Sequence, residues 1–214
     1  MIIEEIMKKN VITLAPNDTI ATAIKLMDEN KIRHIPIVDV NQHVIGLISD
    51  RDLRDAKPSI LDFTNHDKKL DTKIKEIMVR NVITGHPLDF VEEVSAIFYE
   101  NRIGCLPIES NGKLVGIITE TDLLHTFVQL TGANQPGTQL EVKVPNRTGT
   151  LADVINVIKE HNVNIHSVLV YPDKDSQYKI LVLRVQTMNP NKIVEHLTNE
   201  GYAVMWPHSS GIRS

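Results

Sequence analysis

Aromatic residues make up only 4% of the 214-residue chain, and a single cysteine, Cys105, is present. Few aromatic side chains predict cores built from Ile, Val and Leu. One cysteine excludes an internal disulfide framework and favours a reducing compartment. No apolar run approaches the roughly 20 residues of a transmembrane helix. The first ten residues, MIIEEIMKKN, lack the apolar core of a signal peptide. We therefore expect a cytoplasmic protein that does not act at a membrane.

The chain also lacks the signatures of several functional classes. Its net charge of −4 gives no basic surface of the kind that binds nucleic acid. The nine histidines form no H-x-x-H or H-E-x-x-H spacing, so we expect no metal site. There is no P-loop and no G-x-S-x-G elbow. Cys105 has no adjacent basic residue to activate it, which favours packing over nucleophilic attack. These absences argue against an enzyme and against a required cofactor.

An internal repeat dominates the first two thirds of the sequence. EIMKKNVIT at residues 5–13 recurs as EIMVRNVIT at 76–84, and GLISDRDL at 46–53 recurs as GIITETDL at 116–123. Each copy reads as strand, helix, two strands in a hairpin, and helix, a β-α-β-β-α unit. Asp18 is expected to cap the first helix. A half-sheet with helices on one face cannot close its own core, so we expect the two units to pack as a pseudo-twofold pair.

The remainder of the chain follows a different pattern. We expect a first unit at 1–56, a linker at 57–73, a second unit at 74–130, a second linker at 131–138 and a third domain at 139–214. The third domain alternates as β-α-β-β-α-β, the ferredoxin-like order. Its last helix is expected to have Asn189 as cap, Pro190 as first helical residue and Gly201 just past the end. The predicted fold class is α/β (α+β) throughout.

Each repeat carries a small hydroxyl residue three positions before an aspartate, at the end of a strand. Ser49-x-x-Asp52 and Thr119-x-x-Asp122 can both act as helix caps. They can also bind a nucleoside phosphate. The hydroxyl and free amides of a helix N-terminus suit a phosphate, and the carboxylate can accept hydrogen bonds from a ribose diol. The residues alone leave both interpretations open.

The repeated pattern resembles a tandem pair of CBS domains, a Bateman module. The resemblance rests on NVIT, IRHIPIVD and GLISDRD in the first copy, and on NVIT, IGCLPIES and GIITETD in the second. It implies an adenosine nucleotide (AMP, ADP or ATP) as a regulatory ligand in the cleft between the units. For the first site it names Thr13, His34, Ile35, Pro36, Ser49 and Asp52, and the chemistry of the residues themselves adds Arg33 and Arg51 as phosphate contacts. For the second site it names Thr84, Cys105, Leu106, Pro107, Thr119 and Asp122.

The two implied sites differ in charge. Arg33, Arg51 and Arg54 of the first copy correspond to Gly104, Thr121 and Leu124 of the second. Because arginine suits bidentate phosphate contact, the first site is predicted to hold the more phosphorylated nucleotide, and the second site to bind a less charged ligand or to stay empty. The alternative is that these arginines point into solvent. His34 could contact the base or could be a partly buried structural histidine.

The segment at 144–165 resembles an ACT domain, a small regulatory fold that often binds amino acids and often pairs through its sheets. The candidate ligand turn is Asn146, Arg147, Thr148, Gly149, Thr150 and Leu151. Asn146 stands where the family commonly has aspartate, so a carboxylate for a ligand ammonium group is missing. Gly149 also suits a tight turn that opens a helix. Pairing of such domains predicts a homodimer.

Two CBS units followed by one ACT domain resemble the AcuB acetoin-utilisation proteins of Gram-positive bacteria. This resemblance implies a role in acetoin or butanediol breakdown and in sporulation, without naming the downstream partner. Three hypotheses follow: a cytoplasmic regulatory sensor of adenosine nucleotides, a ligand-free assembly adaptor, and an unrecognised enzyme of acetoin catabolism. Ligand-dependent stability separates the first two, and turnover by the purified protein would support the third.

Overall fold

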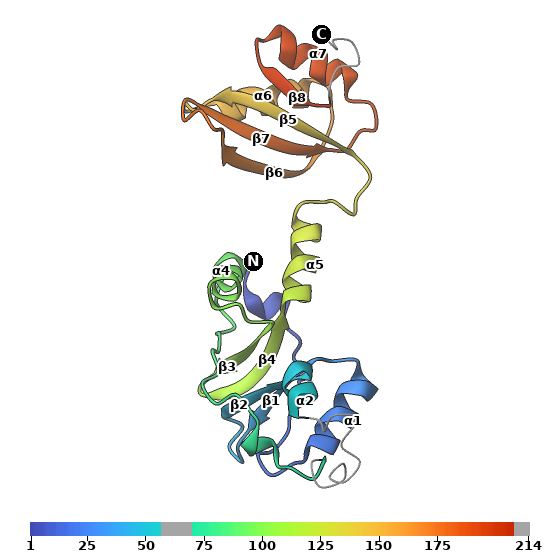
Figure 1. Cartoon of the computed structure of the whole chain (residues 1–214). Helices are drawn as coiled ribbons and strands as arrows, with labels where there is room; N and C mark the ends of the chain where they lie inside the picture. Colours follow the sequence, from blue (N-terminus) through green and yellow to red (C-terminus); the bar gives the residue numbers. More distant parts are fainter. Residues whose placement is uncertain (57–69, 208–214) are drawn as a thin grey trace. The chain divides into compact units, whose positions relative to one another are not determined.

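The structure, a computed structural model, describes residues 1–56 and 70–207 (Figure 1). It divides into two compact units, Met1–Leu124 and His125–Ser214. Most of the predicted first linker lies outside the described residues. Within the described residues, no helix combines the length and the apolar character that crossing a bilayer requires.

The N-terminal unit contains both repeats in the expected order (Figure 1). The first has η1 (Ile3–Glu5), α1 (Ile20–Asn30), β1 (His34–Val38), β2 (Val44–Ser49) and α2 (Asp50–Ala56). The second has η2 (Ile74–Glu76), α4 (Val91–Asn101), β3 (Cys105–Ser110), β4 (Lys113–Thr119) and α5 (Glu120–Leu130). Strands β1 and β2 pair antiparallel, as do β3 and β4. The predicted helix, hairpin and helix of each repeat are therefore confirmed.

The first predicted strand of each repeat is much shorter than expected. In the first repeat it reduces to one parallel bridge between Leu14 and Ile37, where the Leu14 amide donates to the Pro36 carbonyl at 3.1 Å. Pro36 has no N–H to continue the ladder, and Pro16 ends the extended segment two residues after Leu14. The second repeat has the equivalent bridge between Gly85 and Ile108.

The cap of α1 also differs from the prediction. The residue at the cap position is Thr19, whose hydroxyl accepts a hydrogen bond from the Thr22 amide at 3.2 Å. Asp18, predicted as the cap, instead accepts from the Ala15 amide at 2.7 Å. Its carboxylate closes the turn that precedes the helix, and the next hydroxyl takes the capping role.

The hydrophobic cores of the two repeats exchange their N-terminal segments. The core built on α1, β1 and β2 includes Ile74 and Met78 from the second repeat. The core built on α4, β3 and β4 includes Ile3 from the first repeat. Ile3 and Ile74 are both fully buried. Each repeat therefore completes its core with a segment of the other.

The same exchange explains a glycine within each of the strands β2 and β4, which lead into the hydroxyl–aspartate motifs. A Cβ at Gly46 would overlap the sulfur of Met78, and a Cβ at Gly116 would overlap the sulfur of Met7. Both methionines come from the repeated sequence EIM of the opposite repeat. The two glycines are thus needed for close approach between the repeats.

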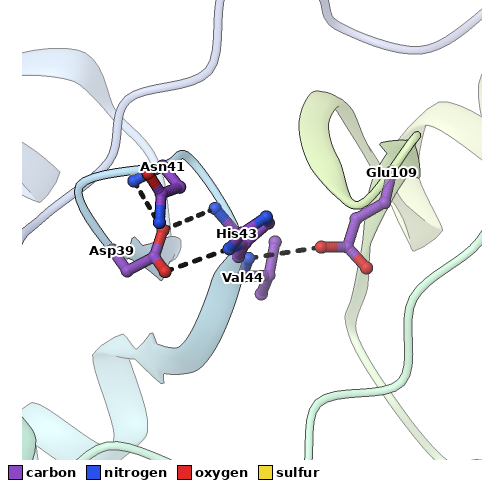
Figure 2. A network of polar contacts seen from close by, with 5 residues as sticks. All are labelled: Asp39, Asn41, His43, Val44 and Glu109. Carbon is purple, nitrogen blue, oxygen red and sulfur yellow. Dashed lines mark hydrogen bonds and ion pairs between the residues drawn. The ribbon is translucent and has the colours of Figure 1, made fainter.

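The hairpin turns of the two repeats are also joined (Figure 2). The Val44 amide donates to Oε1 of Glu109 at 3.2 Å. Beside it, Asp39 accepts hydrogen bonds from the amides of Asn41 and His43 and contacts His43 Nδ1 at 3.0 Å. The hydrogen bond from the His43 backbone is the main cause that lowers the pKa of Asp39. These contacts hold the turn that presents Val44 to the second repeat.

Beyond α5, the described residues of the C-terminal unit form a four-stranded sheet and two helices (Figure 1). Its elements are β5 (Thr138–Pro145), α6 (Thr150–Glu160), β6 (Ile165–Pro172), β7 (Tyr178–Val185), α7 (Asn191–Asn199) and β8 (Ala203–Trp206). The strand order is β6-β7-β5-β8, and all pairs are antiparallel. Alternate residues of β5 and β7 pack with α6 and α7 in one core. The predicted β-α-β-β-α-β order is confirmed.

Two local predictions in this unit shift slightly. Helix α7 begins at Asn191, so Pro190 occupies the cap position rather than the first helical position. Asn189 Oδ1 accepts a hydrogen bond from the Asn191 amide at 3.2 Å, and Gly201 follows the helix with a φ of +88°. The predicted linker at 131–138 is bound to the sheet, since Arg184 donates to the Gln135 carbonyl at 2.7 Å.

Candidate functional site

Both hydroxyl–aspartate motifs form helix caps. In the first motif, the amide and hydroxyl of Ser49 donate to Asp52 Oδ2, each at 2.7 Å, and the Asp52 amide donates back to the hydroxyl at 3.3 Å. In the second, the Thr119 amide donates to Asp122 Oδ2 at 2.9 Å, and the Asp122 amide donates back at 3.4 Å. The capping interpretation is correct for both. Since the caps use Oδ2, they are compatible with a ligand role for the other carboxylate oxygen.

His34 lies near charged residues at the starts of both α2 and α5, since Asp50, Asp52 and Glu120 all act on its charge. His34 pairs with Ser49 in the first hairpin, and a Cβ built on Gly104 would lie 3.1 Å from its imidazole ring. Burial lowers the pKa of His34 below its ordinary 6.5, and the charge of Arg33 lowers it further, against opposing effects of nearby carboxylates that include Glu120. The imidazole is therefore mostly neutral at pH 7, able to donate one hydrogen bond and accept another.

A cavity of about 250 Å³ lies beside this contact. Lys31, Arg33 and His34 line it from the segment that leads into β1. Thr119 and Thr121 line it from the second motif, at the N-terminus of α5. Its volume lies just below the range of about 300–1,000 Å³ for small-molecule sites. The cavity thus joins cationic side chains of one repeat to hydroxyl groups of the other.

The remaining wall comes from the first segment of the chain. Val11 and Ile12 supply an apolar surface, and Lys8 supplies another ammonium group. Lys8 Nζ lies 3.0 Å from Asp122 Oδ1. Sequence reasoning missed Lys8 as a site residue. The available signal was its position in EIMKKN, because the second repeat has Val79 at the matching place in EIMVRN.

The predicted site residues fall into several groups. The cavity brings Arg33 and His34 together with Thr119. Ser49 and Asp52 sit at the start of α2, half-buried, while Arg51 is exposed. Arg54 pairs with Asp50 on the same helix at 3.3 Å with most of its side chain exposed. Arg33 therefore lines the same cavity as Thr119 and Thr121 of the second motif. The sequence prediction had placed Arg33 in the first site only.

Other predicted residues are buried within the hairpins. Ile35 and Leu106 are fully buried, and Pro36 and Pro107 are buried beside them. The Pro36 and Pro107 carbonyls accept hydrogen bonds from Leu14 and Gly85. Thr13 and Thr84, which precede these two residues, are half-buried. A contact of these buried side chains with a ligand base stays a prediction.

Cys105 is a buried thiol in the second hairpin. Burial raises the pKa of Cys105 to about 12, so its thiol is protonated at neutral pH and is a poor nucleophile. In the parts of the chain that the structure describes, no group of three His, Cys, Asp or Glu side chains could hold a metal ion. What the cavity offers is cations, hydroxyl groups and a neutral imidazole.

The candidate turn of the C-terminal unit is mostly structural in character. Asn146 donates through its side-chain amide to the Ser176 carbonyl at 3.2 Å. Gly149 has a φ of +91° at the cap of α6, which explains the glycine. Thr150 is buried and donates to the Arg147 carbonyl at 3.1 Å. Thr148 is exposed, and Leu151 is 38% exposed. A ligand role for this turn stays a prediction.

Comparison with known proteins identifies the domain families of the chain and the solved structures that share its fold. The family model for the CBS domain matches residues 3–59 and 74–129, and the model for the ACT domain matches residues 138–201. The inosine-5′-monophosphate dehydrogenase of Methanocaldococcus jannaschii is 34% identical over 122 residues. That match covers 56% of this chain but only 22% of the enzyme.

Two solved structures share the fold of the paired repeats. The acetoin utilization protein (AcuB) from Vibrio cholerae is 30% identical, with a TM-score of 0.55, over 63% of this chain and 96% of that one. The CBS domain pair of protein MJ0100, solved in complex with 5′-methylthioadenosine and S-adenosyl-L-methionine, is 29% identical, with a TM-score of 0.52. The match covers 63% of this chain and 98% of that one. The chain thus belongs to the CBS-domain family, with two CBS units followed by an ACT domain.

Proposed function

We propose that this chain is a non-catalytic regulatory protein that binds an adenosine nucleotide in the cavity between its CBS units. The observation that carries the proposal is the cavity itself. It places the cations of Lys31 and Arg33, and the neutral imidazole of His34, opposite the hydroxyl groups of Thr119 and Thr121. Cations and hydroxyl groups at a helix N-terminus suit a phosphate, and the apolar Val11 and Ile12 suit a base.

The bound CBS pair of protein MJ0100 supports an adenosine compound as ligand, since that structure contains 5′-methylthioadenosine and S-adenosyl-L-methionine. We assign ribose binding to Asp122 and Asp52, and phosphate contact to Thr119 and Ser49. The two motifs have the same cap geometry on Oδ2, and in the second motif Oδ1 of Asp122 also lies 3.0 Å from Lys8 Nζ. AMP, ADP and ATP remain the candidate nucleotides.

The wider role is part of the same proposal. The Vibrio cholerae structure is described as an acetoin utilization protein, which supports a role in acetoin utilisation. A cytoplasmic location, butanediol utilisation and sporulation belong to the proposal through the sequence resemblance alone. The ACT domain would pass the ligand state to a partner, within a homodimer, and could take an amino acid at its turn. Ligand can drive such a change only by binding one arrangement better than another.

The test is thermal unfolding of the nucleotide-stripped protein with and without AMP, ADP, ATP, 5′-methylthioadenosine and S-adenosylmethionine. Calorimetric titration of each hit would follow. A ligand at 100 times its dissociation constant should stabilise the fold by about 2.7 kcal/mol. Asp122→Asn and Asp52→Asn are suitable variants, because asparagine keeps an oxygen for the cap but loses the charge.

We expect at least one of these variants to lose most of the ligand-dependent stabilisation while its unliganded stability stays close to that of the wild type. No stabilisation by any adenosine compound would reject the sensor and leave the assembly adaptor. Conversion of acetoin by the purified protein would contradict the non-catalytic assignment.

A further inference from the structure

Lys8 occupies a defined place beside the second motif. Its amide donates to the Ile117 carbonyl at 2.9 Å, and the Ile117 amide donates to the Lys8 carbonyl at 3.0 Å. These two bonds fix the backbone of Lys8 against β4. The side chain reaches Asp122, with Nζ 3.0 Å from Oδ1. The lysine side chain is 61% exposed and that of the aspartate only 17% exposed. The ammonium group therefore covers a largely buried carboxylate.

The first motif has the same backbone geometry without the cation. Val79 and Leu47 exchange two hydrogen bonds of 2.9 Å, as Lys8 and Ile117 do. Valine thus stands where lysine stands in the other half of the pair, and an ion pair with Asp52 from this position is impossible. The repeat has kept the backbone contact and changed the charge at one position.

The position of Lys8 matters for any ligand of the second motif. Lys8 lines the cavity together with Thr119, and Asp122 is the carboxylate assigned to the ribose. A ribose diol that approaches Asp122 Oδ1 competes with the ammonium group for that oxygen. A phosphate on the same ligand offers that ammonium a new anionic partner, whereas a methylthio group offers none and a sulfonium group repels it.

We propose that Lys8 is a specificity-determining residue that makes the second motif select adenosine ligands with a phosphate over those with an uncharged or cationic 5′ group. This inference rests on the proposed function, and it names the ligand class of that site. Lys31 and Arg33 line the same cavity and act in the same direction. The second motif therefore takes an anionic nucleotide, and the ion pair is exchanged for a phosphate contact on binding.

The experiment compares AMP with 5′-methylthioadenosine by calorimetric titration, on the full chain. In Lys8→Met we expect weaker AMP binding and stronger 5′-methylthioadenosine binding, so that the preference for AMP falls by about tenfold. Lys8→Gln, which keeps a polar side chain without charge, should show the same direction. Thermal unfolding of each unliganded variant checks that the fold is intact.

The chain offers two matched controls. Lys9→Met removes a neighbouring lysine that pairs with Glu4 at 3.2 Å on the surface, and the preference should stay as in the wild type. Val79→Lys places the same cation beside the first motif, and any weak site there should shift towards AMP.

The outcomes separate this inference from the function on which it rests. Binding of either compound with an unchanged preference in Lys8→Met and Lys8→Gln would overturn the role of Lys8 and leave the proposed function standing. Failure of every protein to bind any adenosine compound would overturn both. An equal loss of preference in Lys9→Met would show a general effect of net charge and would also overturn the role of Lys8.

Discussion

In the first CBS unit, the segment lying against the motif strand carries Val79; in the second, the equivalent segment carries Lys8. Around this difference the two units match closely. Both bury an isoleucine of the opposite repeat, both need a glycine beside a methionine, and both close the motif with the same cap. The comparison teaches that the residues that hold the units together match in the two repeats, while among the cavity residues two of the charged ones differ: Lys8 and Arg33 correspond to Val79 and Gly104.

The largest expected effect on stability comes from the isoleucines that each CBS unit contributes to the core of the other. Ile3→Ala and Ile74→Ala should each lower the free energy of unfolding by about 2–5 kcal/mol, because each empties a fully buried position in the core of the opposite unit. Urea unfolding measures the change, and Val40→Ala, at a 96% exposed position, is the control. A loss below about 0.5 kcal/mol in Ile3→Ala would show that the first segment is not docked in the second core.

The comparison of caps predicts a smaller effect. Ser49→Ala and Thr119→Ala should each cost about 1 kcal/mol, because each removes the hydroxyl that caps a helix. If the cavity is the nucleotide site, stabilisation by AMP should fall more in Thr119→Ala, whose hydroxyl lines the cavity. Urea unfolding with and without AMP separates the two quantities. Equal responses to AMP in both variants would argue against an asymmetric cleft.

The smallest expected effects are on the pH dependence of the free energy of unfolding. His34 of the first repeat and Cys105 of the second occupy matching positions. The pKa of His34 is lowered on folding, so the unfolded chain binds more protons as the pH falls below 6.5. Stability should therefore be present above pH 6.5 and be lost as the pH falls towards the folded pKa. Unfolding measured from pH 5 to 7 should show a flatter slope in His34→Gln, and an unchanged slope would contradict the assignment.

Cys105 should act at the opposite end of the scale. Folding raises the pKa of its thiol from 9.0 to about 12, so the unfolded chain loses a proton first as the pH rises. Stability should decline from about pH 9 upwards, and Cys105→Ala should reduce that slope. Because Cys105→Ala also leaves a small cavity, the measurement compares how steeply stability falls with pH in the variant and the wild type, rather than their absolute stabilities.

The order of elements could be predicted from the sequence because the signals are local. The repeat, the hairpins and the ferredoxin-like order follow from apolar periodicity and turn residues, which the structure matches in each repeat. The exchange of segments could not be predicted. The sequences around Ile3 and Ile74 would be the same whether each isoleucine packed in its own unit or in the other one. Deciding between them requires the positions of both cores.

The candidate site shows the same limit. The motif residues Thr119 and Asp122 could be identified because their spacing repeats. Lys8 could not, since it lies far from Asp122 in the sequence and meets it only through the exchange of segments. Arg33 was assigned to the first site by proximity in sequence; its carbonyl accepts a hydrogen bond from the Asp50 amide of α2, and it also lines the cavity that contains Thr119, which the sequence did not reveal.

The exchanged segments also constrain how the chain folds as it is synthesised. The core of the first CBS unit lacks Ile74 and Met78 until the ribosome has passed the start of the second repeat. Ile3 is made long before Leu106 and Ile118, the residues against which it finally packs. Domains generally fold as units during synthesis, but here neither CBS unit can close alone. The nascent N-terminal half therefore stays incompletely folded until most of the second CBS unit has been synthesised.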